Sequence, residues 1–388
     1  MLRSTLLACF ALACGAAAKG SDRFQFRHVE TKANKHPTHN YTVYTDTYLS
    51  IPMELAPGEM IFTDESKTPL QMPATKAKGY AIVGFSGEIV DGNNESAPLS
   101  ECYDHHWIAV QESHENPFCE GSPNYIVGIG AESRNTKDIY PSGYGYVVKP
   151  FENKWAANIH LLHTVDLAGE DPYRATKECN ECYYADTKGP ECTRDQNGTF
   201  MCCGDGCPDH TCFCPTKADA DMTKTSTFML RYQVNYTYDL DQITPLDIGI
   251  LTAPDCQLFY SVLENNEEPE TVTSQTFTAP KDIEAVYAVG HQHVGAINIS
   301  MFVNDEFVCA SYPRYGQTPD KAGDELGFVV EMSTCLDKDG PAGSYSVKKG
   351  DQVRIDSWYW VGSNDTRIYP HPGGTHLNVM AYMYLAFV

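Results

Sequence analysis

The chain has 388 residues, a formal net charge of −23 at pH 7 and an isoelectric point of about 4.8. This acidic balance, without a local basic patch, argues against nucleic acid or an anionic membrane surface as a partner. After the N-terminal 18 residues, no stretch of the sequence approaches the roughly 18 consecutive apolar residues that a membrane-spanning helix needs. The length predicts two packed units. Plentiful aromatic and β-branched residues, with few helical periodicities, predict a mostly β protein.

The first 18 residues predict a secretory signal peptide. Arg3 supplies a positive charge, residues 6–14 are apolar, and the alanines at 16–18 supply a cleavage site. A lipoprotein signal that uses Cys14 is the alternative. We therefore expect a secreted, extracellular glycoprotein. Six N-x-S/T sequons agree with export, at Asn40, Asn94, Asn197, Asn235, Asn298 and Asn364.

Short β-strands follow one another along the mature chain. Residues 19–40 are polar, hold three irregularly spaced histidines and predict a leader that crosses the surface. Strands are predicted over 41–50, 79–90, 101–110, 155–163, 228–238, 246–251, 257–263, 283–289, 297–303, 352–360 and 375–388. Such a run of strands predicts two units, over residues 19–240 and 241–388, with a cysteine-rich insertion at about 175–216 in the first.

The insertion has too few apolar residues to build a core, so crosslinks must hold it together. Its eight cysteines are Cys179, Cys182, Cys192, Cys202, Cys203, Cys207, Cys212 and Cys214. Disulfides are expected in an exported chain, and a zinc knuckle that includes His210 is the alternative. The expected mature chain has thirteen cysteines, so one thiol is free or pairs with another molecule. Cys309 and Cys335 flank a loop between strands and are a candidate pair.

His291-Gln-His293 is the first histidine feature that suggests a metal site. Residues i and i+2 of a strand point to the same face, so the two imidazoles are presented side by side. Two unrelated surface histidines are the alternative.

His105-His106 is the second such feature. Adjacent residues of a regular strand face opposite sides, so both bind one ion only if the strand is twisted or bulged, or if different ring nitrogens are used. Otherwise one is buried and the other exposed. His160 and His163 lie in one apolar run and face opposite sides, so at most one joins a common site.

The last strand places His376, Asn378, Met380, Tyr382 and Tyr384 on one face. Imidazole with a soft thioether suits copper, because imidazole binds both oxidation states and the thioether favours Cu(I). A methionine that only fills a gap is the alternative.

These features follow one another along the chain as a histidine pair, a histidine in an apolar strand, a His-x-His motif and a methionine in the last strand. This order resembles the ligand order of the copper type II, ascorbate-dependent monooxygenases, which are typified by peptidylglycine α-hydroxylating monooxygenase. The resemblance implies two tandem antiparallel β-sandwich, jelly-roll-like subdomains and two copper sites. It implies that His105, His106 and His160 hold one copper, and that His291, His293 and Met380 hold the other. It further implies catalytic roles for Met380, His291, His293 and Tyr384, with ascorbate or another external reductant; His376 and His163 are additional candidate ligands.

A closer resemblance, from about residue 40 to the C-terminus, is to the plant stress up-regulated Nod 19 family. It rests on the segments Pro98-Leu-Ser-Glu-Cys-Tyr-Asp-His-His-Trp107, Gly130-Ala-Glu-Ser-Arg134, Asn158-Ile-His160, Cys179-x-x-Cys182, Cys202-Cys203, His291-Gln-His293 and Glu331-Met-Ser-Thr-Cys335. This second resemblance implies fold and compartment more than chemistry.

Two departures from the monooxygenases limit the functional prediction. Val289 stands where peptide-hydroxylating members place an arginine for the substrate carboxylate, which counts against a peptidyl-glycine substrate. The cysteine-rich insertion is also foreign to them. The hypotheses are therefore a copper monooxygenase that hydroxylates a C–H bond of an unknown substrate with O2, and a non-catalytic secreted copper-binding or structural glycoprotein. An adhesion-type β-sandwich without metal is the third.

Overall fold

The computed structural model describes residues 23–388 except 64–67, 120–124, 137, 169–210, 215, 255, 258, 264 and 363–375. The predicted signal peptide, most of the cysteine-rich insertion, and the sequons at Asn197 and Asn364 lie outside the described residues. Within the described part the regular structure is almost entirely β, apart from short 3-10 turns such as Pro150–Glu152 and Leu240–Gln242. The predicted fold class, mostly β with layered antiparallel sheets, is confirmed.

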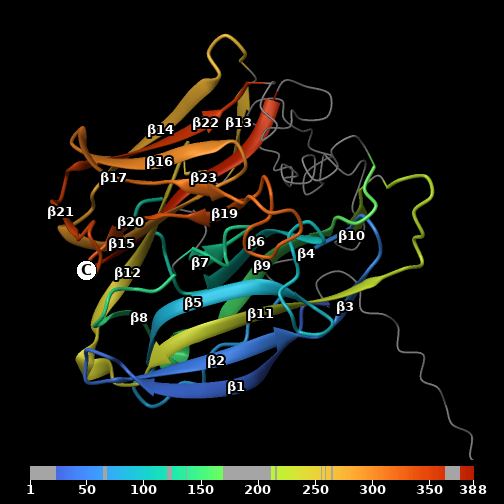
Figure 1. The fold of residues 1–388 in the computed structure, drawn as a ribbon. Coiled ribbons are helices and arrows are strands. Elements are labelled where there is room, and N and C mark those ends of the chain that lie inside the picture. The colour runs from blue at the N-terminus through green and yellow to red at the C-terminus, as the bar shows by residue number, and fades with distance from the viewer. Residues whose placement is uncertain are drawn as a thin grey trace, which may run out of the picture.

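The N-terminal half consists of two facing layers of strands, drawn in blue to green in Figure 1 except for the yellow β11 and the yellow-green β10. The first layer has the order β1 (Phe26–Lys35), β2 (Thr42–Ser50), β11 (Ser226–Thr237), β5 (Tyr80–Asp91) and β8 (Tyr144–Val148), and β3 (Met53–Leu55) also pairs with β11. The second layer has the order β10 (Thr211–Phe213), β4 (Glu59–Phe62), β9 (Trp155–His163), β6 (Cys102–Gln111) and β7 (Tyr125–Ile129).

The C-terminal half is layered in the same way and lies above the first in Figure 1. One layer has the order β12 (Thr244–Thr252), β23 (His376–Phe387), β15 (Ile283–Gln292) and β20 (Thr334–Asp337), to which β13 (Phe259–Leu263) and β21 (Tyr345–Val347) attach. The other has the order β14 (Glu270–Thr278), β22 (Gln352–Trp360), β16 (Ala296–Val303) and β17 (Glu306–Ser311). The strands β18 (Pro313–Tyr315) and β19 (Val329–Met332) form a separate pair.

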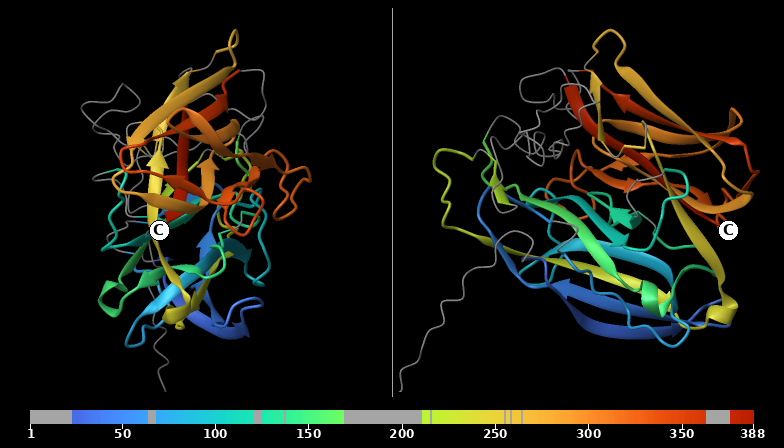
Figure 2. Two further views of the ribbon diagram at one scale, coloured as in Figure 1. Left: turned by 90° about the vertical axis from the view of Figure 1, so that its left-hand side faces the viewer. Right: turned by 180° about the vertical axis from the view of Figure 1, so that it is seen from behind.

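One sheet passes through both halves. β8 pairs in parallel with β12, from Thr244 opposite Tyr144 to Leu246 opposite Tyr146, whereas the other strand ladders are antiparallel. The largest apolar cluster of the described residues also spans the two halves and includes Trp107, Tyr232 and Phe387. The halves are therefore packed together along their length, as the two views of Figure 2 show. The predicted boundary near residue 240 falls at the 3-10 turn that leads from β11 into β12 and stays a prediction.

Two disulfides join described cysteines. Cys309–Cys335 confirms the predicted pair, and Cys119–Cys256 links the two halves. Cys214 is also disulfide-bonded, which favours crosslinks over a zinc knuckle at that end of the insertion. Cys102 is a free, buried thiol, in line with the odd cysteine count.

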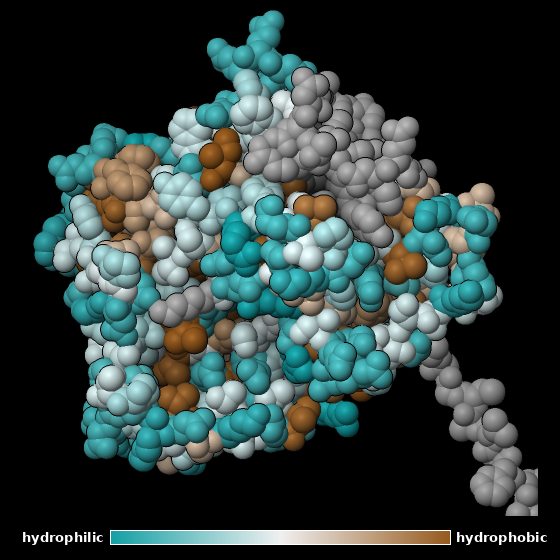
Figure 3. All heavy atoms as spheres, viewed as in Figure 1, coloured by the Kyte–Doolittle hydropathy of each residue, from teal (hydrophilic) through white to brown (hydrophobic). Residues whose placement is uncertain are grey.

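The predicted surface leader is partly wrong, because ten of its residues form the edge strand β1. Backbone hydrogen bonds to β2 hold this strand, and nearly all its side chains are exposed, so no apolar alternation marked it in the sequence. The face in Figure 3 is mainly hydrophilic, with apolar residues in small groups, as the acidic composition suggests. Among the described residues, no helix has the length and apolar character needed to cross a membrane.

Candidate metal centre

A β-bulge in β6 brings His105 and His106 together. The register of β6 against β9 shifts between Asp104 and His106, so the two histidines no longer obey strict alternation. Their Nδ1 atoms lie 3.2 Å apart. Two nitrogens that bind one ion in tetrahedral geometry at about 2.0 Å are about 3.3 Å apart. Of the alternatives that the sequence left open for His105 and His106, the structure therefore shows the bulged strand, with both side chains on the same side.

His160 completes a group of three on the neighbouring strand β9. It stands directly opposite His106 in the ladder, and its ring stacks on His105 with centroids 4.6 Å apart. One ligand atom from each of the three residues lies within 4.8 Å of the others. The geometry therefore brings together the three histidines that the resemblance to the copper monooxygenases assigns to one ion.

His163 does not join this group. Its Nδ1 lies 2.8 Å from the carbonyl oxygen of Ala56, and its ring packs against Phe228. Of the two histidines on this strand, His160 therefore lies with His105 and His106, and His163 faces away from them.

His291 and His293 lie at the end of β15 with ring centroids 5.5 Å apart. His291 stacks on Tyr382, its partner in β23, at 4.6 Å. The side-by-side presentation expected of HxH in a strand is therefore present. The backbone of His376 starts β23, and its side chain is outside what the structure describes.

The two histidine groups are in contact, although they come from different halves. The ring of His293 lies 4.9 Å from that of His105, centroid to centroid. We call the set His105, His106, His160, His291 and His293 the five-histidine cluster. The resemblance implied two separate sites, whereas here the two ligand groups share one buried region.

Burial keeps most of these rings neutral. Each of the five is at most 4 % exposed. Burial, with the neighbouring histidines, lowers the pKa of His105, His160 and His293 well below the usual value. Burial also lowers the pKa of His106, to about 4, although the hydrogen bond that its Nε2 donates to Oδ1 of Asn158 acts in the opposite direction. Neutral imidazole is the form that binds a metal ion, so this environment favours ligation at neutral pH.

Several ring nitrogens of the cluster fit a metal ligand's role. Nε2 of His291 and both ring nitrogens of His293 are buried without a hydrogen-bond partner among the described residues. Each such group costs about 1–3 kcal/mol when nothing satisfies it. An ion bound to these nitrogens would remove that cost, so the residues fit a metal.

Two side chains that no sequence pattern indicated hold the rings of His291 and His106 in position. Glu132 Oε1 lies 2.5 Å from Nδ1 of His291, and Asn158 Oδ1 lies 2.9 Å from Nε2 of His106. Each contact occupies one ring nitrogen and leaves the other for a metal, as outer partners of metal-binding histidines commonly do. Both residues lie in segments quoted above for the family resemblance, Gly130–Arg134 and Asn158–His160, but spacing alone did not reveal their roles.

Two methionines lie close to the cluster in the fold. Sδ of Met60, on β4, is 2.6 Å from Nε2 of His160. Met380 is buried on β23, and the Tyr359 hydroxyl donates to its carbonyl oxygen while accepting from the N–H of His293. The Tyr359 hydroxyl therefore links the backbone of His293 to the backbone of Met380 on β23 through two hydrogen bonds. The sequence drew attention to Met380 and missed Met60.

Glycines of β7 and the following residue allow the two halves to approach. A Cβ at Gly128 would lie 1.7 Å from the hydroxyl oxygen of Tyr384, and one at Gly130 would lie 3.0 Å from Cε1 of His291. Any side chain at Gly128 would therefore collide with Tyr384. These glycines let the strand pair β15–β23 pack directly against β7.

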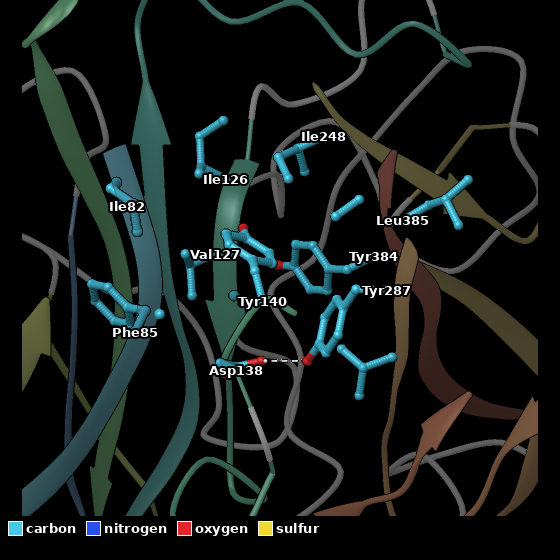
Figure 4. Close-up of a pocket in the computed structure, with 14 residues that line it drawn as sticks. Ile82, Phe85, Ile126, Val127, Asp138, Tyr140, Ile248, Tyr287, Tyr384 and Leu385 are labelled. Atoms are coloured by element: carbon cyan, nitrogen blue, oxygen red, sulfur yellow. Dashed lines mark hydrogen bonds between the residues drawn. The ribbon is translucent and has the colours of Figure 1, made fainter. Parts of the chain in front are cut away.

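A pocket lies beside the cluster, between the halves. Val289 and Tyr384 are paired in the ladder, two pairs along from His291 and Tyr382, and both line the pocket. Figure 4 shows the Tyr287 hydroxyl directed at Asp138, at 3.4 Å. Burial and the Glu132 charge raise the pKa of Asp138 to about 8, so this carboxyl is mostly uncharged at neutral pH. The pocket is thus largely apolar, with tyrosine hydroxyls and one neutral acid.

Together, the fold and the site define an all-β protein with a buried histidine cluster suited to a metal ion. The chain belongs to the Stress up-regulated Nod 19 family, whose match covers residues 112–386. The match includes His160, His291, His293 and Met380, whereas His105 and His106 precede it.

Other comparisons add little. No curated protein matches the chain. A solved structure of the infectious bursal disease virus VP2 subviral particle aligns with 91% of this chain and 73% of that chain at 8% identity, with a TM-score of 0.19. That likeness is too weak to support an argument.

Proposed function

We propose that this protein is a secreted copper-binding protein that uses two coppers, an external reductant such as ascorbate and O2 to hydroxylate a C–H bond. The observation that carries the proposal is the 3.2 Å separation of the Nδ1 atoms of His105 and His106, with His160 against both. A cluster of neutral imidazoles with a thioether close by is a donor set suited to copper.

The residues of the chain divide into holding and shaping roles. His105, His106 and His160 would hold one copper, and His291, His293 and Met380 the other. Copper would supply one-electron redox chemistry with O2. Glu132 and Asn158 fix the ring orientation of His291 and His106, so these imidazoles meet the ion without rearrangement.

The cavity next to the cluster has a volume of about 20 Å³, room for about one water molecule, so it is too small to hold a substrate in this structure. Val289 and Tyr384 line it, and Asp138 is its neutral acid. Val289 offers no charge to a substrate carboxylate, so a peptidyl-glycine is disfavoured.

Burial favours a second candidate, a non-catalytic copper-binding glycoprotein of the same fold. All five rings of the cluster are at most 4 % exposed, which suits an ion that is held permanently. In this alternative each copper crosslinks strands within its own half, and Tyr384 has a packing role only.

The experiment is metal analysis with oxygen uptake on the secreted protein. The proposal predicts two bound coppers, and loss of copper in His106→Ala and in Met380→Ala but not in the matched control His163→Ala. It also predicts O2 consumption that depends on ascorbate or another reductant. Two bound coppers with no uptake under any reductant would support the non-catalytic candidate, and no bound copper would refute both.

A further inference from the structure

We infer that Met60 is a second thioether ligand, which joins His105, His106 and His160 at their copper. This inference rests on the proposed copper binding. It adds a residue to a group that both spacing and family resemblance present as histidine alone.

The first support is the position of the sulfur. Sδ of Met60 lies 2.6 Å from Nε2 of His160, so the thioether touches a ligand ring directly. Met60 pairs with Leu162, two residues from His160 on β9, and therefore lies on the same face of the sheet. The ladder between β4 and β9 fixes this position.

The second support is burial with a rigid backbone. Met60 is 0 % exposed and lies between β10 and β9 in the sheet order. A bound ion would replace a packing contact of the sulfur without needing a new backbone position. Gap filling alone accounts for a buried methionine, but it does not require the sulfur to face an imidazole nitrogen.

The chemical consequence concerns the oxidation state. A thioether is a soft ligand that favours Cu(I), whereas imidazole serves both states. With Met60 bound, the three-histidine group also prefers Cu(I). Each histidine group then has its own methionine, Met60 for one and Met380 for the other.

The first test uses Met60→Leu, a volume-conserving change, with the buried Met53→Leu of β3 as its control. Copper–sulfur scattering by X-ray absorption and Cu(I) affinity by competition with a chromophoric chelator are measured anaerobically. We expect Met60→Leu to lose part of the copper–sulfur signal and to bind Cu(I) at least about tenfold more weakly, while Met53→Leu matches wild type. Wild-type scattering and affinity in Met60→Leu would overturn the inference.

A second test does not depend on the folding of Met60→Leu. Selenomethionine-labelled Met380→Leu protein should still show copper–selenium scattering, because Met60 remains as a ligand. Absence of that scattering in copper-loaded protein would overturn the inference. Failure of wild-type protein to bind copper would instead remove the proposed function.

Discussion

The imidazole of His293 lies 4.9 Å from that of His105, and the two residues belong to different halves of the chain. Each half therefore supplies part of one buried cluster. The continuous sheet through β8 and β12 and the disulfide Cys119–Cys256 both limit relative movement of the halves. The distance between the two ligand groups is accordingly a property of the fold.

Replacing Glu132 by Gln should weaken metal binding. The carboxylate holds Nδ1 of His291 and increases the basicity of the ring, and the neutral amide does this less well. The expected loss of affinity is about 10–100-fold, measured by competition with a chelator. Glu95→Gln, at an exposed turn, is the control; equal affinities of the two variants would contradict the role of Glu132.

Gly128→Ala should destabilise the protein through a collision with Tyr384. The added Cβ would lie 1.7 Å from the hydroxyl oxygen, and overpacking of this kind costs about 1–3 kcal/mol. Urea unfolding measures the change in the free energy of unfolding. Tyr384→Phe removes that oxygen, so the double variant should recover part of the loss. Additive losses would show that the strain arises elsewhere.

The carboxyl of Asp138 should make stability depend on pH. Burial raises its folded pKa to about 8, above the usual value of 3.8, so the folded state holds a proton that the unfolded chain releases. Its contribution is present below pH 3.8 and is lost as pH rises towards 8. Asp138→Asn should therefore gain stability over wild type by up to about 1.4 kcal/mol per pH unit across that window. A difference in unfolding free energy that is the same at pH 4.5 and pH 8 would contradict this assignment.

The two disulfides should differ in their stabilising effect. Cys119–Cys256 closes a separation of 137 residues and Cys309–Cys335 one of 26. Because the longer loop loses more conformational entropy in the unfolded chain, Cys119–Cys256 should stabilise the folded state by about 1.5 kcal/mol more than Cys309–Cys335. Denaturant unfolding of the two paired Cys→Ala variants tests this order, and a larger loss on removing Cys309–Cys335 would contradict it.

The sequence predicted side-chain positions correctly where the two-residue alternation of a β-strand determines which face a side chain occupies. The alternation of a strand placed His291 beside His293 and separated His160 from His163, and the structure agrees. The bulge at His105 was only one of several alternatives, because a register shift depends on the partner strand.

Contacts between distant segments could not be predicted. Met60 reaches His160 through the β4–β9 ladder, and Glu132 reaches His291 from the other half. No local pattern encodes either distance. Cys119–Cys256 was missed for the same reason, since many pairings of the cysteines were open.

β23 lies between β12 and β15, although it follows both in sequence. The centre of this sheet is therefore complete only when residues 376–387 have been synthesised and pair with β12 and β15. Tyr382 and Met380 arrive with them, after every histidine of the cluster. Of the proposed copper ligands, Met380 is therefore the last to reach its place in the fold.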